Sequence, residues 1–401
     1  MTRRPLVVAV LASLAVTTSL IVGSMQPAVA ELVDGNPSSA SPATAGRTQP
    51  TADRIPVPGH EVYGYVPYWE MDDGIAGHLA ATDLTTLALF SVTHGKSGAL
   101  STNQNGYRRI TDDIGRRLIA EAHDRGIRVE LVYTSFGSAK NEAFFTRPEV
   151  QERAIAELVA LASDLGVDGI NVDVELLPVE HVATYGAFVG RLRDAFRTVR
   201  DDGQVSVATT ANVRGAAMAV AASTAGADRI FMMGYDYHWS GSEPGASAPL
   251  DRRDGNEKDL PWSLDLYRLA GVPVERTLLG LPLYGMSWET ESPEPGASAS
   301  SRGTIWIPRR NLGDLADPSS PPVLDPLEGV EVLAVPEGDR WRTIYFDSAA
   351  SLTPKLALAD SRGLAGAGFW AIGYERGLPD YTSLISTFRA GKLGTSDAAK
   401  P

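Results

Sequence analysis

The chain has 401 residues, with 49 acidic and 36 basic side chains, a net charge of −13 and no cysteine. This acidic balance argues against a nucleic acid or an anionic surface as the partner and suits a neutral substrate. Without disulfides, stability has to come from a large apolar core, which a chain of this length can supply.

The first 30 residues have the three parts of a secretory signal peptide. Arg3 and Arg4 form a positive start, Leu6 to Gly23 is a nearly unbroken apolar run, and Ala28-Val29-Ala30 has the pattern of a cleavage site. An uncleaved membrane anchor is the alternative, because the run is close to the length of a spanning helix. Small residues and Pro27 follow the run instead of a basic cluster, which favours cleavage. We therefore expect a secreted, extracellular protein with no membrane contact after cleavage.

Residues 31–58 are rich in Ala, Ser, Pro and Thr and contain few large apolar side chains. Such a segment cannot bury enough surface to fold, so we interpret it as a disordered linker. The catalytic domain is expected over residues 59–391, followed by a short tail at 392–401.

After the linker, short apolar runs rich in strand-forming residues alternate with helical patterns. Eight such runs are Glu61–Pro67, Thr85–Thr93, Arg128–Phe136, Gly169–Leu176, Val205–Ala211, Arg229–Tyr237, Thr277–Tyr284 and Gly366–Ile372. The alternation implies right-handed βαβ units and a parallel sheet. Eight units predict an α/β fold of the closed (β/α)8 TIM barrel type. An open doubly wound sheet is the alternative, but no Gly-rich phosphate loop follows the first strand.

The segment between the third and fourth strands illustrates the helical pattern. Apolar residues recur there at helical spacing: Val150, Ala154, Leu158, Leu161 and Leu165. Thr146 is expected to cap this helix, Pro148 to lie in its first turn and Gly166 to end it. The next connection repeats the pattern with Tyr185, Phe188, Leu192, Phe196 and Val199.

The connection between Tyr284 and Gly366 is too long for a simple βα unit. Its start is rich in Pro, Ser and Gly, and strand-like pieces follow at Thr304–Ile307 and Val330–Val335. We interpret residues 289–345 as a small insertion between the seventh and eighth strands. Because loops at the carboxyl ends of barrel strands build the active site, the insertion is expected to wall it.

The fourth strand carries a column of polar side chains. Period-two alternation points Asn171, Asp173 and Glu175 toward the barrel axis. Such a column is costly without a purpose, although a network that only fixes strand register is the alternative. Two neighbouring carboxyl groups can divide acid catalysis and stabilisation of an oxocarbenium-like centre. We therefore expect Glu175, with a raised pKa, to be the proton donor and Asp173 to be its partner.

The run of residues 168–175, D-G-I-N-V-D-V-E, resembles the D-G-x-D-x-D-x-E signature of glycoside hydrolase family 18. Three further segments resemble family motifs in the same order. Met233–Tyr237 is similar to M-x-Y-D-[YF], Leu281–Gly285 to the P-x-Y-G motif, and Gly368–Ala371 to the segment with the strand-eight tryptophan. The resemblance covers Gly59 to Gly391.

This resemblance implies a chitinase-like enzyme that cleaves β-linked N-acetylglucosamine glycans by substrate-assisted, retaining catalysis. The acetamido oxygen of the substrate would attack the anomeric carbon and form an oxazolinium ion. Glu175 would protonate the leaving oxygen and later activate water, and Asp173 would hold the acetamido N–H. The resemblance further implies that Tyr235 donates to the acetamido oxygen, Asp236 binds the distorted sugar and Trp370 forms the floor of the subsite.

Asn171 departs from the commoner family residue, which is Asp. A carboxylate there would repel Asp173, whereas an amide can only hydrogen-bond to it. With Asn at this position, the motif resembles that of a subgroup that includes spore cortex-lytic N-acetylglucosaminidases and di-N-acetylchitobiase. Met286, where chitinases often have Arg, also points away from ordinary chitinases.

Several aromatic residues lie at or beyond predicted strand ends, where their faces could stack on pyranose rings, with core packing as the alternative for each. We expect substrate contacts from Trp370, Trp69, Trp239 and Trp288. The family resemblance adds Tyr65, Met233, Tyr237 and Tyr284.

No cofactor is expected, and a metal site is not predicted. The six histidines, at 60, 78, 94, 123, 181 and 238, show no ligand spacing. Two competing functions are a noncatalytic glycan-binding lectin and an unrelated barrel hydrolase that uses Asp173 as a nucleophile. Retention of Glu175, Asp173 and Tyr235 argues against the lectin. The expected partner is the glycan substrate alone, bound by a monomer.

Overall fold

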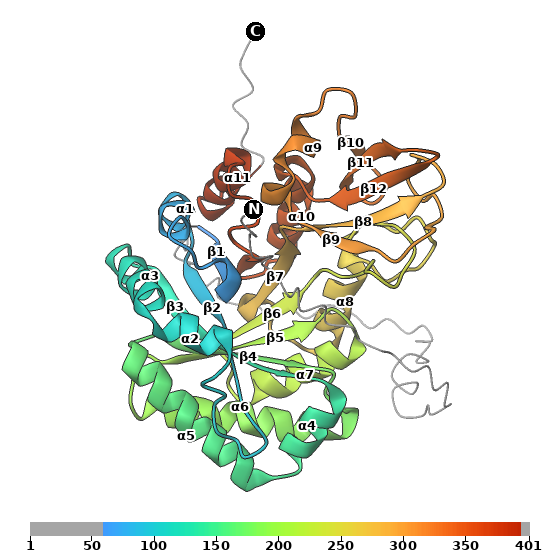
Figure 1. Ribbon diagram of the computed structural model, residues 1–401. Coiled ribbons are helices and arrows are strands. Elements are labelled where there is room, and N and C mark those ends of the chain that lie inside the picture. Colours follow the sequence, from blue (N-terminus) through green and yellow to red (C-terminus); the bar gives the residue numbers. More distant parts are fainter. Residues whose placement is uncertain (1–58, 394–401) are drawn as a thin grey trace, which may run out of the picture. The chain divides into compact units, whose positions relative to one another are not determined.

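The structure is a computed structural model, and it describes residues 59–393 (Figure 1). The predicted signal peptide, the predicted linker and most of the predicted tail lie outside the described residues. Within residues 59–393, the helices are all too short or too polar to cross a membrane.

Eight parallel strands close into a barrel in the order β1, β13, β7, β6, β5, β4, β3, β2. Their bounds are β1 (Glu61–Pro67), β2 (Thr86–Thr93), β3 (Arg128–Phe136), β4 (Gly169–Glu175), β5 (Gln204–Thr210), β6 (Arg229–Met233), β7 (Thr277–Pro282) and β13 (Gly366–Trp370). The predicted TIM barrel is confirmed. The largest difference is in β6, which ends at Met233 and not at Tyr237. Gly234 makes one more bond to Gly280 of β7, and the chain then turns at Asp236, whose φ is +63°.

Helices surround the barrel (Figure 1). They are α1 (Ile75–Ala81), α2 (Asn105–Thr111), α3 (Asp113–Asp124), α4 (Ser138–Phe145), α5 (Pro148–Leu165), α6 (Val182–Arg197), α7 (Val213–Thr224), α8 (Leu260–Ala270), α10 (Ala349–Ser361) and α11 (Pro379–Arg389). Short 3₁₀ turns add Tyr68–Glu70, Val179–His181, Val274–Arg276 and Pro308–Arg310.

Helix α5 tests the helical prediction. Its predicted apolar residues are all buried, and Gly166 ends it in the left-handed conformation at φ +71°. Thr146 does not cap it, because its hydroxyl donates to the carbonyl of Glu142 at the end of α4, and Arg147 precedes the helix without a side-chain cap. In α6, Val199 lies beyond the last turn and is exposed, so its predicted place in the apolar face is wrong.

The core has two layers. The outward faces of the strands pack against the helices, which explains why the strands read as nearly continuous apolar runs. Inside the barrel a smaller cluster is centred on Tyr63, Tyr65 and Phe231. Phe231 fits because Gly280 and Gly368 face it: a Cβ at either would lie 2.4 or 2.6 Å from its ring. The small residues therefore make room for the large ring beside them, as close packing in a barrel requires.

The insertion is a five-stranded antiparallel sheet beside the barrel, drawn in yellow to orange in Figure 1. Its order is β10 (Val323–Asp325), β11 (Val330–Glu337), β12 (Arg340–Phe346), β8 (Gly285–Thr290) and β9 (Thr304–Trp306), with α9 (Leu312–Ala316) between β9 and β10. The sheet starts at Gly285, four residues before the predicted boundary, because β8 follows the Tyr284 turn directly. Buried Glu70 holds the insertion to the barrel by accepting from Arg309 at 2.6 Å and from Arg376 at 3.0 Å.

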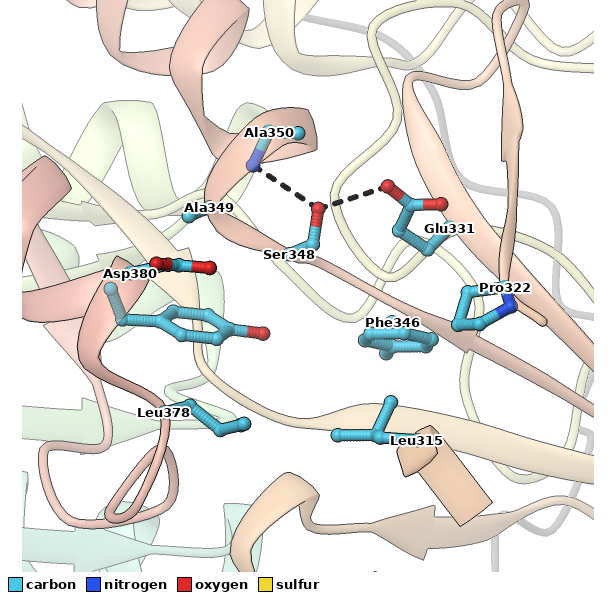
Figure 2. Close-up of a pocket in the computed structure, with 10 residues that line it drawn as sticks. Leu315, Pro322, Glu331, Phe346, Ser348, Ala349, Ala350, Leu378 and Asp380 are labelled. Carbon is cyan, nitrogen blue, oxygen red and sulfur yellow. Dashed lines mark hydrogen bonds between the residues drawn. The ribbon is translucent and has the colours of Figure 1, made fainter. Parts of the chain in front are cut away.

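A cavity of about 330 Å³ lies where the insertion meets the starts of α10 and α11 (Figure 2). Its walls are mainly apolar, with Leu315, Phe346 and Leu378 among them. The Ser348 hydroxyl accepts from the amides at the start of α10 and donates to Glu331 at 3.0 Å. These polar groups are therefore engaged in joining α10 to the insertion, and none of the predicted site residues lines the cavity.

Candidate active site

The polar column of β4 lies as the alternation predicts. Asn171 and Asp173 are buried, Glu175 is half-buried at the carboxyl end of the strand, and the intervening Val172 and Val174 pack toward the helices. Across the sheet Asp173 is in register with Thr134 of β3 and Ala208 of β5. The column therefore runs from the barrel interior to the face where barrel enzymes carry their catalytic groups.

Asp173 lacks the partners that a buried carboxyl group normally has. Its side chain is 5% exposed, and its Oδ1 atom makes no hydrogen bond to the described residues. Burial first, and the charge of Glu175 second, raise the pKa of Asp173 well above its usual range. A buried oxygen without a donor in the protein indicates an acceptor position for a ligand N–H or O–H group.

Glu175 is positioned through its backbone. Its carbonyl oxygen accepts from the side-chain amide of buried Asn141 at 2.5 Å and from the amide of Gly137 at 3.2 Å. The following residue, Leu176, has φ +59°. Burial, with a further contribution from the charge of Asp236, raises the pKa of Glu175 to about 7. The group can therefore hold a proton near neutral pH, as a general acid must. No motif in the sequence singles out Asn141.

The loop after β6 brings a second acidic group to the same end of the barrel. Asp236 accepts a hydrogen bond from the hydroxyl of Tyr284, and its backbone amide donates to Ser247 at 3.0 Å. The ring of Tyr235 lies edge-on to that of Tyr284, 6.2 Å between centroids. Asp236 is exposed as a whole residue, but its carboxyl group is largely removed from water. This burial raises the pKa of the Asp236 carboxyl group. The structure thus brings Tyr235, Asp236 and Tyr284 together.

Two other predicted contacts belong to the scaffold around this loop. The Tyr237 hydroxyl donates to Ser263 of α8 at 2.6 Å, which anchors the loop to that helix. Met233 is buried in the barrel cluster, against which Tyr235 and Trp370 pack.

The expected contact between Asn171 and Asp173 is not present as a hydrogen bond. The Asn171 amide oxygen accepts from the Tyr65 hydroxyl at 3.1 Å, and its amide nitrogen donates to Ser206 at 2.7 Å. Ser206 in turn donates to the buried carboxyl group of Glu130. Asn171 is therefore committed to a network below Asp173, and Tyr65 is a buried member of that network.

The predicted tryptophans divide into two kinds. Trp370 is half-buried between Phe90, 4.7 Å away, and Tyr65, 5.6 Å away, and Trp69 lies edge-on to it with 41% of its surface exposed. Trp239 is also 41% exposed, in the loop after β6. The prediction for Trp288 is wrong, because it is only 1% exposed and packs against Tyr345 inside the insertion. The prediction assumed that Trp288 lies in a loop beyond the seventh barrel strand. It lies instead within β8, which is a strand of the inserted sheet.

One group of possible metal ligands occurs among residues 59–393. Ligand atoms of Glu142, Glu180 and His181 all lie within 4.8 Å of one another, and the two glutamates are exposed. Histidine spacing did not indicate this group, because Glu142 comes from a different helix. It shares no residue with the β4 column.

A carboxyl group with a pKa near neutrality, beside a second buried carboxyl group at the carboxyl end of a closed barrel, is the arrangement of a glycoside hydrolase. Comparison with known proteins agrees: the family model "Glycosyl hydrolases family 18" matches residues 61–375. The chain belongs to glycosyl hydrolases family 18.

The chain is 24% identical over 310 residues to the cortical fragment-lytic enzyme of Bacillus subtilis (strain 168), covering 74% of this chain and 67% of that protein. It is 32% identical over 155 residues to a class V chitinase of Lotus japonicus, covering 36% and 37% of the two chains. Among solved structures, the Group IV chitinase of Ostrinia furnacalis in complex with allosamidin has a TM-score of 0.71 at 19% identity, covering 83% of this chain and 99% of that one. The last of these likenesses supports the fold alone.

The pKa of Glu175 predicts how activity depends on pH. Because the acid has to be protonated, we expect kcat/KM to fall as the pH rises through about 7. This descending limb of the pH profile reflects the titration of Asp173 and Glu175 together, because the two carboxyl groups interact. Asp236→Asn removes a charge that raises the Glu175 pKa, so the limb should move to lower pH, although activity also falls. A profile on a soluble N-acetylglucosamine oligomer checks both points. A limb unmoved in Asp236→Asn would contradict the electrostatic assignment.

The network around Asn171 predicts the effect of a carboxylate there. Asn171→Asp replaces a donor to Ser206 with an acceptor and adds a buried charge near Glu130 and Asp173, so we expect a loss of about 1–3 kcal/mol in stability at pH 8. The new carboxyl group would have a folded pKa above its unfolded value. The loss should therefore be small below pH 4 and grow as the pH rises.

Thermal unfolding of Asn171→Asp from pH 4 to 8 measures this, with Asn256→Asp as a control at an exposed amide. Equal melting temperatures for the parent and Asn171→Asp at pH 8 would mean that the network does not constrain position 171.

Proposed function

We propose that the protein is a secreted, retaining glycoside hydrolase that cleaves β-linked N-acetylglucosamine glycans, chitin oligosaccharides or peptidoglycan, by substrate-assisted catalysis. The observation that carries the proposal is the buried, unpartnered Oδ1 of Asp173 next to Glu175, whose pKa is raised to about 7. The relatives' names support the substrate class, since they include a cortical fragment-lytic enzyme and a class V chitinase. Secretion rests on the signal-peptide pattern at residues 1–30.

In this mechanism the sugar is cleaved by its own acetamido group. Asp173 accepts the acetamido N–H on its free oxygen, which turns the acetamido oxygen toward the anomeric carbon. Glu175 protonates the leaving oxygen as the bond breaks, and an oxazolinium ion forms. Glu175 is then a carboxylate, and it takes a proton from the water that opens the ring.

The remaining groups hold the reacting sugar. Asp236, fixed by Tyr284, accepts from sugar hydroxyl groups, and Tyr235 donates to the acetamido oxygen. Trp370 gives the ring an apolar face to lie on. The assignment to a lectin is disfavoured because a binding site does not need an acid whose pKa is raised toward neutrality.

Product analysis tests the substrate class. The protein is incubated separately with chitooligosaccharides, purified peptidoglycan and an N-glycoprotein, and the products are identified by mass spectrometry. Absence of cleavage in all three would remove the proposed function.

Replacing the acid should abolish turnover without abolishing binding. Glu175→Gln is nearly isosteric but cannot donate a proton of suitable acidity, so we expect kcat to fall at least about 100-fold with affinity largely kept. Steady-state kinetics and calorimetric binding on the same oligosaccharide measure the two effects. Glu149→Gln, on the exposed start of α5, is the matched control. Turnover within threefold of the parent would exclude Glu175 from this role.

Substrate assistance makes the acetamido group part of the machinery. We expect a thiazoline analogue of the oxazoline to inhibit competitively, and the first product to keep the β configuration by NMR. An inverted first product would rule out the mechanism. Cleavage of a glucoside without an acetamido group would favour instead a barrel hydrolase in which Asp173 is the nucleophile.

A further inference from the structure

A second cavity lies beside the candidate active site, at the carboxyl ends of β1 and β2. It has a volume of about 440 Å³, and its lining includes Tyr68, Trp69, Asn105, Arg108, Arg109 and Asp112. The tryptophan comes from the turn after β1, and the polar residues come from α2 and the start of α3. No predicted site residue other than Trp69 lines it, and the mechanism above uses none of its charged groups.

Two aspartates and two arginines line this cavity, and three of these four side chains have a charged partner. Asp72, also in its wall, is paired with Arg376 at 2.7 and 2.8 Å. Asp112 accepts from two amides at the start of α3 and pairs with Arg109 at 3.2 Å. The guanidinium group of exposed Arg108 makes no hydrogen bond or ion pair within residues 59–393. Arg108 is therefore the one charged side chain of the lining that has no partner among residues 59–393, in a chain whose net charge is −13.

The cavity is adjacent to the expected position of the glycan. The Trp69 ring lies 6.4 Å from that of Trp370, the expected floor of the reacting sugar, and its Nε1 donates to the hydroxyl of Tyr374 at 3.1 Å. Trp69 is therefore a fixed, partly exposed aromatic face between the reacting position and Arg108. A saccharide stacked on it would place its substituents in the cavity.

The helix that carries Arg108 is held rigidly against the barrel. Gly106 of α2 packs so closely on the end of β2 that a Cβ there would lie 2.1 Å from the carbonyl oxygen of Ser91. The same position would be 3.3 Å from the ring of Tyr68. The backbone of α2 is thus fixed relative to the Trp69 turn, so the Arg108 side chain reaches the cavity from a defined position.

We propose that this cavity binds a carboxylate carried by the glycan, with Arg108 as its partner and Trp69 as the platform for the saccharide that bears it. The proposal rests on the proposed function and selects among its substrates. Chitin is neutral and offers the guanidinium group of Arg108 no anionic partner. Peptidoglycan carries carboxylates, either on the lactyl group of muramic acid or on the attached peptide, and guanidinium groups bind carboxylates through paired hydrogen bonds.

Binding measurements in the Glu175→Gln background separate this inference from catalysis. The ligands are a neutral chitooligosaccharide, peptidoglycan strands that keep their peptides, and strands whose peptides an amidase has removed to leave a free lactyl carboxylate. Arg108→Gln should weaken binding of carboxylate-bearing strands about tenfold, as expected for a charge-assisted hydrogen bond, and change chitooligosaccharide binding less than twofold.

Arg125→Gln is the matched control, because this exposed arginine lies at the far end of α3 and its side chain bonds only to the carbonyl of Glu121. Arg108→Glu should weaken the same ligands further. A loss with both kinds of strand, or with only one, supports the proposal and identifies the source of the carboxylate. An equal loss with the neutral and acidic ligands, or no loss with any, overturns it. Carboxylate-dependent binding without cleavage by the parent enzyme would count against the proposed function alone.

Discussion

Withdrawal of Asp173 and Glu175 from water is the constraint on which the rest of the site depends. A carboxylate removed from water without a cation is unstable, and the two groups respond by holding protons to higher pH. The barrel makes this possible because eight strands with large and small residues fitted around one axis supply enough buried apolar surface to offset the cost.

Other buried charges show by contrast what is special about this pair. Lys355 and Asp347, both fully buried, form an ion pair, and Glu70 is surrounded by arginines. Removal of one partner from such a pair would leave an uncompensated charge, so these contacts fix the position of α10 and of the insertion. Asp173 has no such partner, and its free oxygen has no role in holding the fold together. Burial of this oxygen without a donor costs free energy and adds no contact that stabilises the fold. A ligand is therefore the expected partner of the Asp173 oxygen.

The sequence predicted the barrel well because each strand is buried on both faces and reads as a short apolar run, and because Gly166 and Pro148 mark the ends of α5 unambiguously. It predicted the β4 column because alternation along a strand is strict. It failed where a residue's role depends on a distant segment. Asn171 was expected to contact Asp173, two residues along the strand. Its amide group is hydrogen-bonded instead to Tyr65 and Ser206, which come from other strands. Trp288 was misplaced for the same reason.

Backbone conformation adds an independent sign of where the fold departs from its most stable form. Two residues other than glycine have positive φ within residues 59–393, Leu176 and Asp236. The first directly follows the proposed acid, and the second is itself a proposed sugar ligand. Such conformations cost about 1–3 kcal/mol each and persist only where surrounding contacts impose them. Here Asn141 and Ser138 hold the chain on either side of the peptide after Glu175, while Ser247 holds Asp236. Two turns with positive φ, which follow β4 and β6, therefore bring carboxyl groups to the same end of the barrel from strands that are separated by β5. Preorganisation of that kind lowers a reaction barrier only if the groups stay in place as charge develops, and the buried side chains of Asn141 and Ser247 provide that restraint better than mobile surface charges would.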